Sequence, residues 1–237
     1  MKSTILFCCL CGLYLSGMAQ SSVTAQTSGT ATSYNVYDMT GKPYRNSEFA
    51  DVTGTPFFDT LWRPAELDMG GGKKMLNVMV KINAYSNEVH FLSVNSVEFT
   101  TPSGLIKRIK FSDSTRQPPV VTLYQCDFPA IDNQKEMSFY QVISAGKLEL
   151  LKSVEKRLEE SKNELTGERS RQFETFENFY VFQNGAMKRL KKDKSSVLEL
   201  MTDQKEKMDA FVAAQKINFK NAESLKKVFD YYNSTGN

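Results

Sequence analysis

The sequence predicts an α+β protein, in which an antiparallel β-meander, as a twisted sheet or a partly closed barrel, is followed by three short helices. Residues 34–143 contain short β-branched and aromatic runs separated by glycine, proline, asparagine and serine, as is typical of strands and their turns. The connections are too short for parallel crossovers, which need about a dozen residues each. After Asp193 the apolar residues recur at helical spacing instead.

The first 19 residues have the pattern of a cleavable secretory signal. Lys2 provides the positive start, an apolar run covers residues 5–15, and Gly17 and Ala19 are the small residues that a cleavage site requires. The apolar run is shorter than the roughly 20 residues that span a bilayer, and no later segment approaches that length. We therefore expect export to the periplasm, the outer-membrane periphery or the medium, without a transmembrane segment.

The cysteines argue against a lipid anchor and against disulfides. Cys8, Cys9 and Cys11 lie within the signal, and none follows the small residue that a lipid-acceptor cysteine needs, so we do not expect a lipoprotein. Cleavage leaves only Cys126, in an apolar run, so no intramolecular disulfide can form. A redox or partner-linking thiol is one interpretation of Cys126. We favour a small buried hydrophobe, because free cysteine is among the most buried residue types.

After the signal, residues 20–33 are small, polar and almost uncharged, which predicts a flexible leader. A β-rich domain is expected over residues 34–192, with a helical segment over 193–237 packed on the same unit. The clearest hairpin joins residues 78–85 to 88–92 across Ser86 and Asn87, with apolar residues alternating along one face. The candidate strands are 35–39, 57–62, 75–85, 89–94, 96–100, 105–111, 120–126 and 137–143.

Residues 147–172 fit either a strand or a helix. Leu151, Val154 and Leu158 follow a helical stripe, whereas Leu148 and Leu150 alternate as in a strand. Segments 139–148 and 179–188 resemble each other, and the second contains Asn-Gly, which is typical of a type I′ hairpin turn. We interpret 137–190 as two hairpins joined by a charged, mobile excursion, with a helix over 151–165 as the alternative.

The last segment is expected to form three helices. The apolar residues repeat at helical spacing, and Asp193, Asp203 and Asn221 are candidate N-caps. Asp203 with Glu206 also resembles a capping box. Helices this short are not stable alone in water, so their apolar faces should pack against one another or against the sheet.

Charge argues against a nucleic-acid partner. Loss of Lys2 with the signal lowers the formal charge from +3 to about +2, which is close to neutral. One basic cluster, residues 188–194, begins with Lys188 and Arg189 and lies close to several aromatic residues. It could attract an anionic polysaccharide, a lipopolysaccharide or a phosphate surface. The plainer interpretation is the solvated end of a strand that leads into a helix.

The chain lacks the residues of the common catalytic and metal sites. His90 is the only histidine, which excludes metal sites built from several histidines, and we expect no metal and no cofactor. Gly70 to Lys74 superficially resembles a phosphate-binding loop, but a Walker loop ends in Ser or Thr and opens a helix, whereas here a β-patterned run follows. Cys126 and His90 could form a nucleophile and base, although no local signature supports the pair. We predict no catalytic residues.

Acidic residues gather near the only tryptophan. Asp59, Glu66 and Asp68 flank Trp62, and an aromatic ring beside acids is the arrangement that a sugar-binding or glycoside-hydrolysing site would use. The structural alternative is that the aspartates belong to turns and that Trp62 anchors the core. A deep acidic cleft beside Trp62 would favour the sugar site, and a fully buried Trp62 would oppose it.

Several segments resemble a group of small exported proteins from gliding and gut-dwelling Gram-negative bacteria. The resemblance covers most of the mature chain, is one of pattern, and implies a strand-rich 137–190 region without assigning an activity or a site residue. It is carried by residues 41–44, 51–58, 61–62, 80–89 and 225–233.

Together these features predict an exported, non-catalytic cell-envelope protein that binds another envelope protein or a glycan through its sheet surface or exposed aromatic residues. The alternative is a carbohydrate-active enzyme or carbohydrate-binding module that uses Trp62 and the nearby acids, and an extracytoplasmic holdase is a third hypothesis. The candidate binding residues are Trp62, Asp59, Glu66, Asp68, Lys188 and Arg189.

Overall fold

The computed structural model describes residues 36–38, 43–44, 49, 51–101 and 104–235. All of these belong to one compact unit, residues 34–237. The expected signal and leader, residues 1–33, lie outside the described residues. None of the described helices is long and apolar enough to span a membrane.

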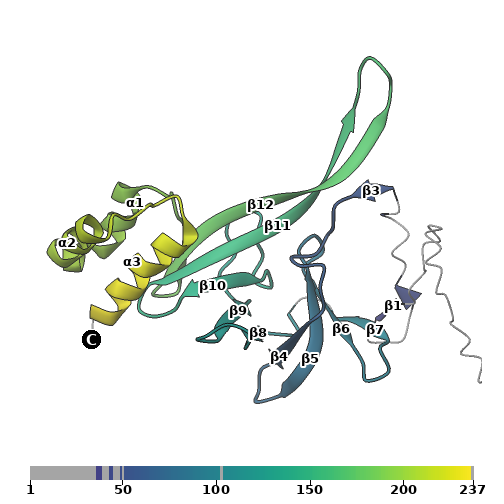
Figure 1. Cartoon of the computed structure of the whole chain (residues 1–237), viewed down its shortest axis with the longest axis horizontal. Coiled ribbons are helices and arrows are strands. Elements are labelled where there is room, and N and C mark those ends of the chain that lie inside the picture. The colour runs from purple at the N-terminus through teal and green to yellow at the C-terminus, as the bar shows by residue number, and fades with distance from the viewer. Residues whose placement is uncertain (1–35, 39–42, 45–48, 50, 102–103, 236–237) are drawn as a thin grey trace, which may run out of the picture. The chain divides into compact units, whose positions relative to one another are not determined.

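The strands form one open, mixed sheet (Figure 1). Its strand order is β13-β12-β11-β10-β9-β8-β4-β5-β6-β7-β1-β2, and β3 lies alongside β12. The strands are β1 (Val36–Asp38), β2 (Pro43–Tyr44), β3 (Val52–Thr53), β4 (Arg63–Asp68), β5 (Lys74–Asn83), β6 (Glu88–Leu92), β7 (Glu98–Thr101), β8 (Arg108–Asp113), β9 (Val120–Gln125), β10 (Tyr140–Ser144), β11 (Glu149–Lys162), β12 (Arg169–Gln183) and β13 (Ala186–Arg189).

The α+β class is confirmed, but the sheet is neither a simple meander nor a closed barrel. Strands β1 and β7 pair in parallel, as do β3 and β12. From β7 the chain passes β6, β5 and β4 before it forms β8 on the far side of β4. Two contacts hold the connection from β7 to β8 in this position. Ile106 is buried in the core, and the Lys107 amide donates to the Asp68 carbonyl at 2.7 Å.

Strand β4 replaces the strand that the sequence predicted over residues 57–62, and that prediction is wrong. Only Phe57 forms a β-bridge, to Asn83, and Asp59 then closes a turn by accepting the Leu61 amide at 3.0 Å. The strand begins later, at Arg63. Its second residue is proline, which in a sequence argues against a strand. The alternation of buried and less buried residues after this proline was therefore not recognised.

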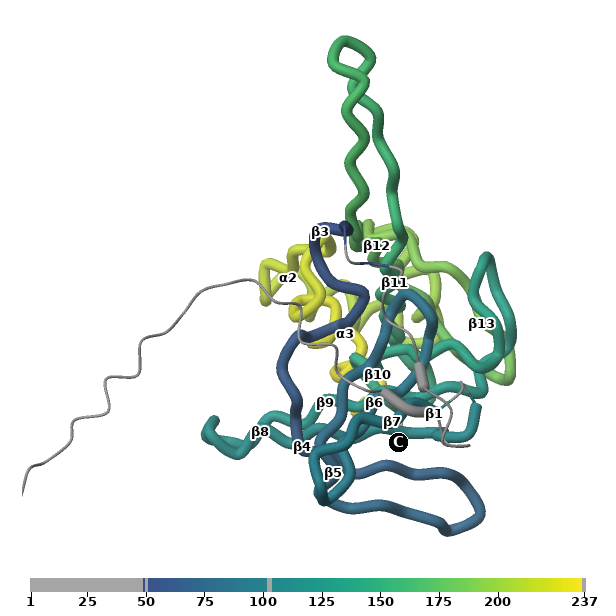
Figure 2. Tube along the Cα trace, turned by 90° about the vertical axis from the view of Figure 1, so that its right-hand side faces the viewer, coloured from purple at the N-terminus to yellow at the C-terminus, as the bar shows by residue number. Residues whose placement is uncertain are grey.

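Strands β11 and β12 form a long two-stranded arm. They pair continuously from Glu149 opposite Phe182 to Lys162 opposite Arg169, so the alternative helix over 151–165 is wrong. What the sequence suggested as a mobile excursion is the outer half of this ladder. The arm extends beyond the other strands and points upward in Figures 1 and 2. Both predicted hairpins flanking it, β10–β11 and β12–β13, are confirmed.

The middle of the arm is held by aromatic packing. The Phe173 ring on β12 meets the rings of Phe49 and Tyr85 at centroid distances of 5.1 and 5.4 Å, both edge to face. Farther out, Arg171 donates to Asp51 at 2.9 Å and to Glu160 at 3.0 Å. A two-stranded ribbon is marginally stable by itself, so these contacts support the arm where no long strand covers it.

The expectation of three short helices is wrong, because only two of the helical segments are more than a turn or two long. A five-residue helix α1 (Lys194–Leu198) runs into a 3₁₀ turn over Glu199–Gln204, and only α2 (Lys205–Gln215) and α3 (Ala222–Thr235) are longer. The apolar face of α3 packs against β10 and β11 (Figure 1). The buried residues of this face are Leu225, Val228, Phe229 and Tyr232.

Two of the three predicted N-caps are confirmed. The Asp193 carboxylate accepts the Ser196 amide at 2.9 Å, and Asn221 accepts the Ser224 amide at 3.0 Å. Asp203 does not cap α2, so the predicted capping box is wrong. Its carboxylate instead accepts hydrogen bonds from the Tyr232 hydroxyl and from Lys147, because α3 and the β10–β11 turn bring these donors to it.

Cys126 is a buried thiol, as the sequence favoured. It is 1% exposed, its Sγ donates to the Ile106 carbonyl at 3.5 Å, and burial raises its pKa to about 11. Since the thiolate is the reactive form, we expect Cys126 in the signal-free chain to react with a disulfide reagent at least about 100-fold more slowly than an ordinary exposed cysteine at about pH 8. Reaction of the same chain in concentrated guanidinium chloride is the control, and equal rates with and without denaturant would contradict the expectation.

Candidate functional site

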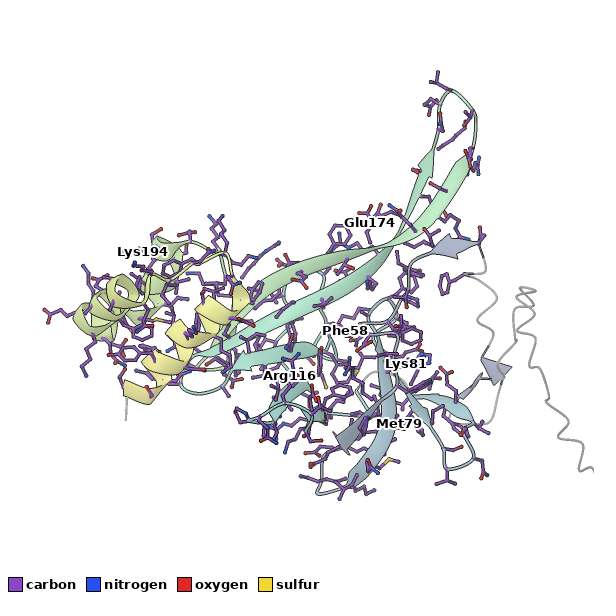
Figure 3. All side chains as sticks on the ribbon, viewed as in Figure 1. Phe58, Met79, Lys81, Arg116, Glu174 and Lys194 are labelled. Atoms are coloured by element: carbon purple, nitrogen blue, oxygen red, sulfur yellow. The ribbon has the colours of Figure 1, made fainter. Side chains whose placement is uncertain are left out.

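A groove of about 530 Å³ lies on one face of the sheet, and we call it the sheet groove. It is lined by residues of β4, β5, β8, β9 and β10, by the turn before β4 and by residues 114–116 after β8. Figure 3 labels Phe58, Lys81 and Arg116, which come from three different parts of this lining.

Strand register brings the floor of the groove together. Directly paired residues of an antiparallel ladder share a face, and Gln141 lies opposite Tyr124, Thr122 opposite Phe111, and Arg63 opposite Val80. Phe111 in turn lies opposite Ala65 of β4. The floor therefore crosses five neighbouring strands, a span of about 19 Å at about 4.8 Å between strands.

Aromatic rings form one wall of the groove. The Tyr124 ring lies 5.1 Å from the Phe58 ring and 5.9 Å from the Phe111 ring, measured between centroids. Burial raises the pKa of Tyr124 to about 12. Its hydroxyl therefore stays protonated at neutral pH and can both donate and accept a hydrogen bond.

Two aspartate–arginine pairs border the groove. Arg63 donates to the Asp59 carboxylate, and Arg116 lies 3.4 Å from the Asp113 carboxylate. The Leu61 amide, with further help from Arg63, lowers the pKa of Asp59. Hydrogen bonds from the Thr115 hydroxyl and amide lower the pKa of Asp113. Both carboxylates are therefore ionised at neutral pH and already hydrogen-bonded.

Trp62 lies next to two lining residues and is half-buried. The Lys81 ammonium sits 4.3 Å from the centre of its ring and 5.1 Å from that of Phe57, within the range of cation–π attraction. Because Trp62 is half-buried, it is not a fully buried core anchor. It is also not the wall of an acidic cleft, because the two acids that line the groove are each paired with an arginine.

The structure does not gather the other predicted acids around Trp62. Asp59 lines the groove, but Glu66 and Asp68 alternate with the buried Ala65 and Leu67 along β4 and so belong to the opposite face. Glu66 accepts a hydrogen bond from Lys74 at 2.7 Å, and Asp68 accepts the Gly70 amide at 2.8 Å. These two acids therefore act in their own hairpin.

Lys188 and Arg189 lie on β13, at one end of the strand order, where β12 and β11 separate β13 from β10, the nearest strand of the groove. Arg189 is 3.4 Å from Asp132 and also donates to Asn178, and both basic residues line a small separate hollow of about 180 Å³. The predicted binding residues thus fall at three places: the sheet groove, the opposite face of β4, and β13.

A second large hollow, of about 680 Å³, lies beside the groove and shares Phe58 with it. It is lined mainly by the β5–β6 turn and by the connection between β9 and β10. The Asn87 side chain joins these two loops by donating to the Met137 carbonyl at 2.6 Å and accepting the Phe139 amide at 3.0 Å. Loop residues, rather than a sheet face, therefore define this hollow.

Within the described residues, no group of three or more His, Cys, Asp and Glu side chains could hold a metal ion. His90 is buried on β6, with Nδ1 at 2.7 Å from Glu98 Oε1 and with its ring against Phe57. Cys126 has its own contacts in the core. His90 and Cys126 therefore contact different residues.

The sequence missed most of the groove. Tyr124, Phe111 and Arg116 were not singled out, although Tyr124 and Phe111 lie in strands that the sequence predicted. The missing information was the position of β4 between β5 and β8, which places Arg63 and the turn before it beside these aromatic residues.

Comparison of the chain with protein-family models, with curated proteins and with solved structures found no match in any of the three. The resemblance to small exported bacterial proteins therefore stays a sequence-based hypothesis.

Proposed function

We propose that the protein is an exported, non-catalytic binding protein of the cell envelope and that the sheet groove is its binding site. The observation that carries this proposal is the make-up of the groove, in which aromatic rings, the hydroxyls of Thr122 and Tyr124, and two aspartate–arginine pairs line one continuous hollow. Small-molecule sites commonly combine apolar walls with a few positioned polar groups. The export part of the proposal is supported by the signal pattern of residues 1–19.

The state of the groove acids favours binding over hydrolysis. A glycoside hydrolase needs a carboxylic acid whose pKa is raised, so that it can donate a proton to the leaving group. The pKa values of Asp59 and Asp113 are both lowered, and each carboxylate is bonded to a backbone amide. Neither residue is suited to act as that acid.

Site-specific photo-cross-linking in cells tests this function. A benzophenone amino acid in place of Val120, which is half-exposed in the groove, is expected to capture an envelope component in the exported protein. The matched control is the same replacement at Leu76, which is exposed on β5 outside the groove lining. Equal capture from both positions, or no capture from Val120, would overturn the proposal.

The same cells test export. The mature protein is expected in the envelope fraction or the medium and to begin at Gln20, which N-terminal mass spectrometry would detect. An unprocessed chain that begins at Met1 and stays in the cytoplasm would contradict the export part of the proposal.

A further inference from the structure

The length of the groove indicates an elongated ligand. Its floor crosses from Gln141 on β10 to Ile82 on β5 over about 19 Å, as five strands at about 4.8 Å spacing require. A compact metabolite would fill only part of this distance. The ligand should therefore be a chain that lies across the strands.

The backbone of the groove leaves few free hydrogen-bonding groups for such a chain. At the floor, β9 pairs with both β8 and β10, and β8 pairs with both β4 and β9. Val80 likewise pairs on both sides, with Arg63 of β4 and with Phe91 of β6. Extended peptides are bound mainly through main-chain hydrogen bonds at a free sheet edge. Most of the backbone at the floor is already paired, with one-sided pairing only at the ends of the ladders, such as Thr122 and Arg63, so recognition falls mainly to side chains.

The polar side chains of the floor argue against an acyl chain. The Thr122 hydroxyl, the Tyr124 hydroxyl and the Gln141 amide form no hydrogen bonds with other side chains or backbone groups in the part of the chain that the structure describes. Covering them with a hydrocarbon would leave all three buried without partners, at a cost of about 1–3 kcal/mol each. A ligand that carries its own donors and acceptors avoids this cost.

Sugar rings have both properties that the groove requires. Their hydroxyls can donate to and accept from Thr122, Tyr124 and Gln141, and their C–H faces can pack on the rings of Phe58 and Phe111. The border is partly ordered before binding, because Arg63 and Arg116 each lie against an aspartate, which lowers the entropy lost on binding. The two pairs balance their own charges, and the remaining charged group of the lining, the Lys81 ammonium, lies over the Trp62 and Phe57 rings, so the border suits a neutral chain.

We infer that the ligand of the sheet groove is a neutral oligosaccharide chain that lies across strands β10, β9, β8, β4 and β5. The inference rests on the proposed function and specifies its ligand. Thr122, Tyr124 and Gln141 bond the sugar hydroxyls, and Phe58 and Phe111 contact the ring faces.

Titration of the purified protein with defined hexasaccharides tests the inference. The probes are maltohexaose, cellohexaose, chitohexaose, mannohexaose and the acidic hexagalacturonic acid, with sodium dodecanoate as the acyl-chain competitor. Calorimetry measures the affinity, and fluorescence of Trp62 reports binding at the groove, because it is the only tryptophan of the chain. We expect saturable binding of at least one neutral hexasaccharide.

Two near-isosteric variants distinguish sugar from hydrocarbon. Thr122→Val and Gln141→Leu are each expected to weaken saccharide binding about tenfold, which corresponds to about 1.4 kcal/mol for a lost hydrogen-bonding group. An acyl ligand would instead bind these variants more tightly than the parent protein. Thr175→Val, exposed on β12 outside the groove, is the matched control and should leave the affinity unchanged.

Three results would overturn the inference: no saturable binding of any neutral hexasaccharide, tighter binding of dodecanoate to Thr122→Val, or saccharide binding that neither groove variant weakens. If cross-linking from Val120 still captures an envelope component in cells, the proposed function stands and only the ligand assignment fails. If Val120 captures no envelope component and no neutral hexasaccharide binds, the proposed function fails as well.

Discussion

Replacing Phe229 with alanine is expected to lower the free energy of unfolding by about 4 kcal/mol, as for other buried phenylalanines. Its side chain on α3 is fully buried, in a cluster that includes Leu148 and Leu150 from the start of the arm and Met208 from α2. Removing the ring would leave a cavity at the point where helices and sheet meet. Urea unfolding followed by circular dichroism measures the change.

Lys227→Ala is the matched control, because residue 227 lies on the exposed side of the same helix. It should change the free energy of unfolding by less than about 0.5 kcal/mol. If Phe229→Ala costs less than about 1 kcal/mol, or unfolds the helices in a separate transition without affecting the sheet, then α3 does not contribute to a common core.

The parts of the fold that the sequence predicted are those that neighbouring residues determine. The β5–β6 hairpin follows from alternating residues on either side of a short turn, and the β12–β13 hairpin follows from Asn184 and Gly185, which have φ angles of 52° and 78°. The buried face of α3 follows from its helical period. In each case the pattern and the contact lie within a few residues of each other.

The parts that the sequence missed depend on distant partners. Strand β3 is two residues long and exists because Val52 and Thr53 pair with Arg171 and Gln172, far along the chain. Asp203 has the local signature of a cap, but its carboxylate contacts Tyr232 and Lys147 instead of capping α2. Local patterns state what a residue can do, whereas tertiary contacts decide which option is used.

The candidate site shows the same division. Asp59, Glu66, Asp68 and Trp62 are close in sequence, yet the pleat of β4 directs Glu66 and Asp68 away from the face that carries the groove. Recognising β4 as a strand would have been enough to separate these acids. To predict that Arg63 lies beside Tyr124 and Phe111, one must also know the strand order β9-β8-β4, and no local sequence pattern contains it.

Replacing Gly146 with alanine is expected to lower the free energy of unfolding by about 3 kcal/mol, at the upper end of the cost of a strained backbone conformation. Gly146 has a φ of 148° in the turn between β10 and β11, and an added Cβ would lie 2.6 Å from Asn233 Cγ. The Asn233 amide cannot move away freely, because it bonds Leu148 and Ala145 at 3.0–3.2 Å. Thermal unfolding should occur about 6–12 °C lower.

Two further variants separate the backbone strain from the steric clash. Gly185 also has a positive φ, of 78°, but an added Cβ there would meet nothing within 4 Å, so Gly185→Ala should cost only about 1–2 kcal/mol. Asn233→Ala removes both its hydrogen bonds and the clash, so it should cost less in the Gly146→Ala background than in the parent protein. Strictly additive costs would show that Gly146 and Asn233 do not interact, and that contact between α3 and the turn is not what requires glycine at this position.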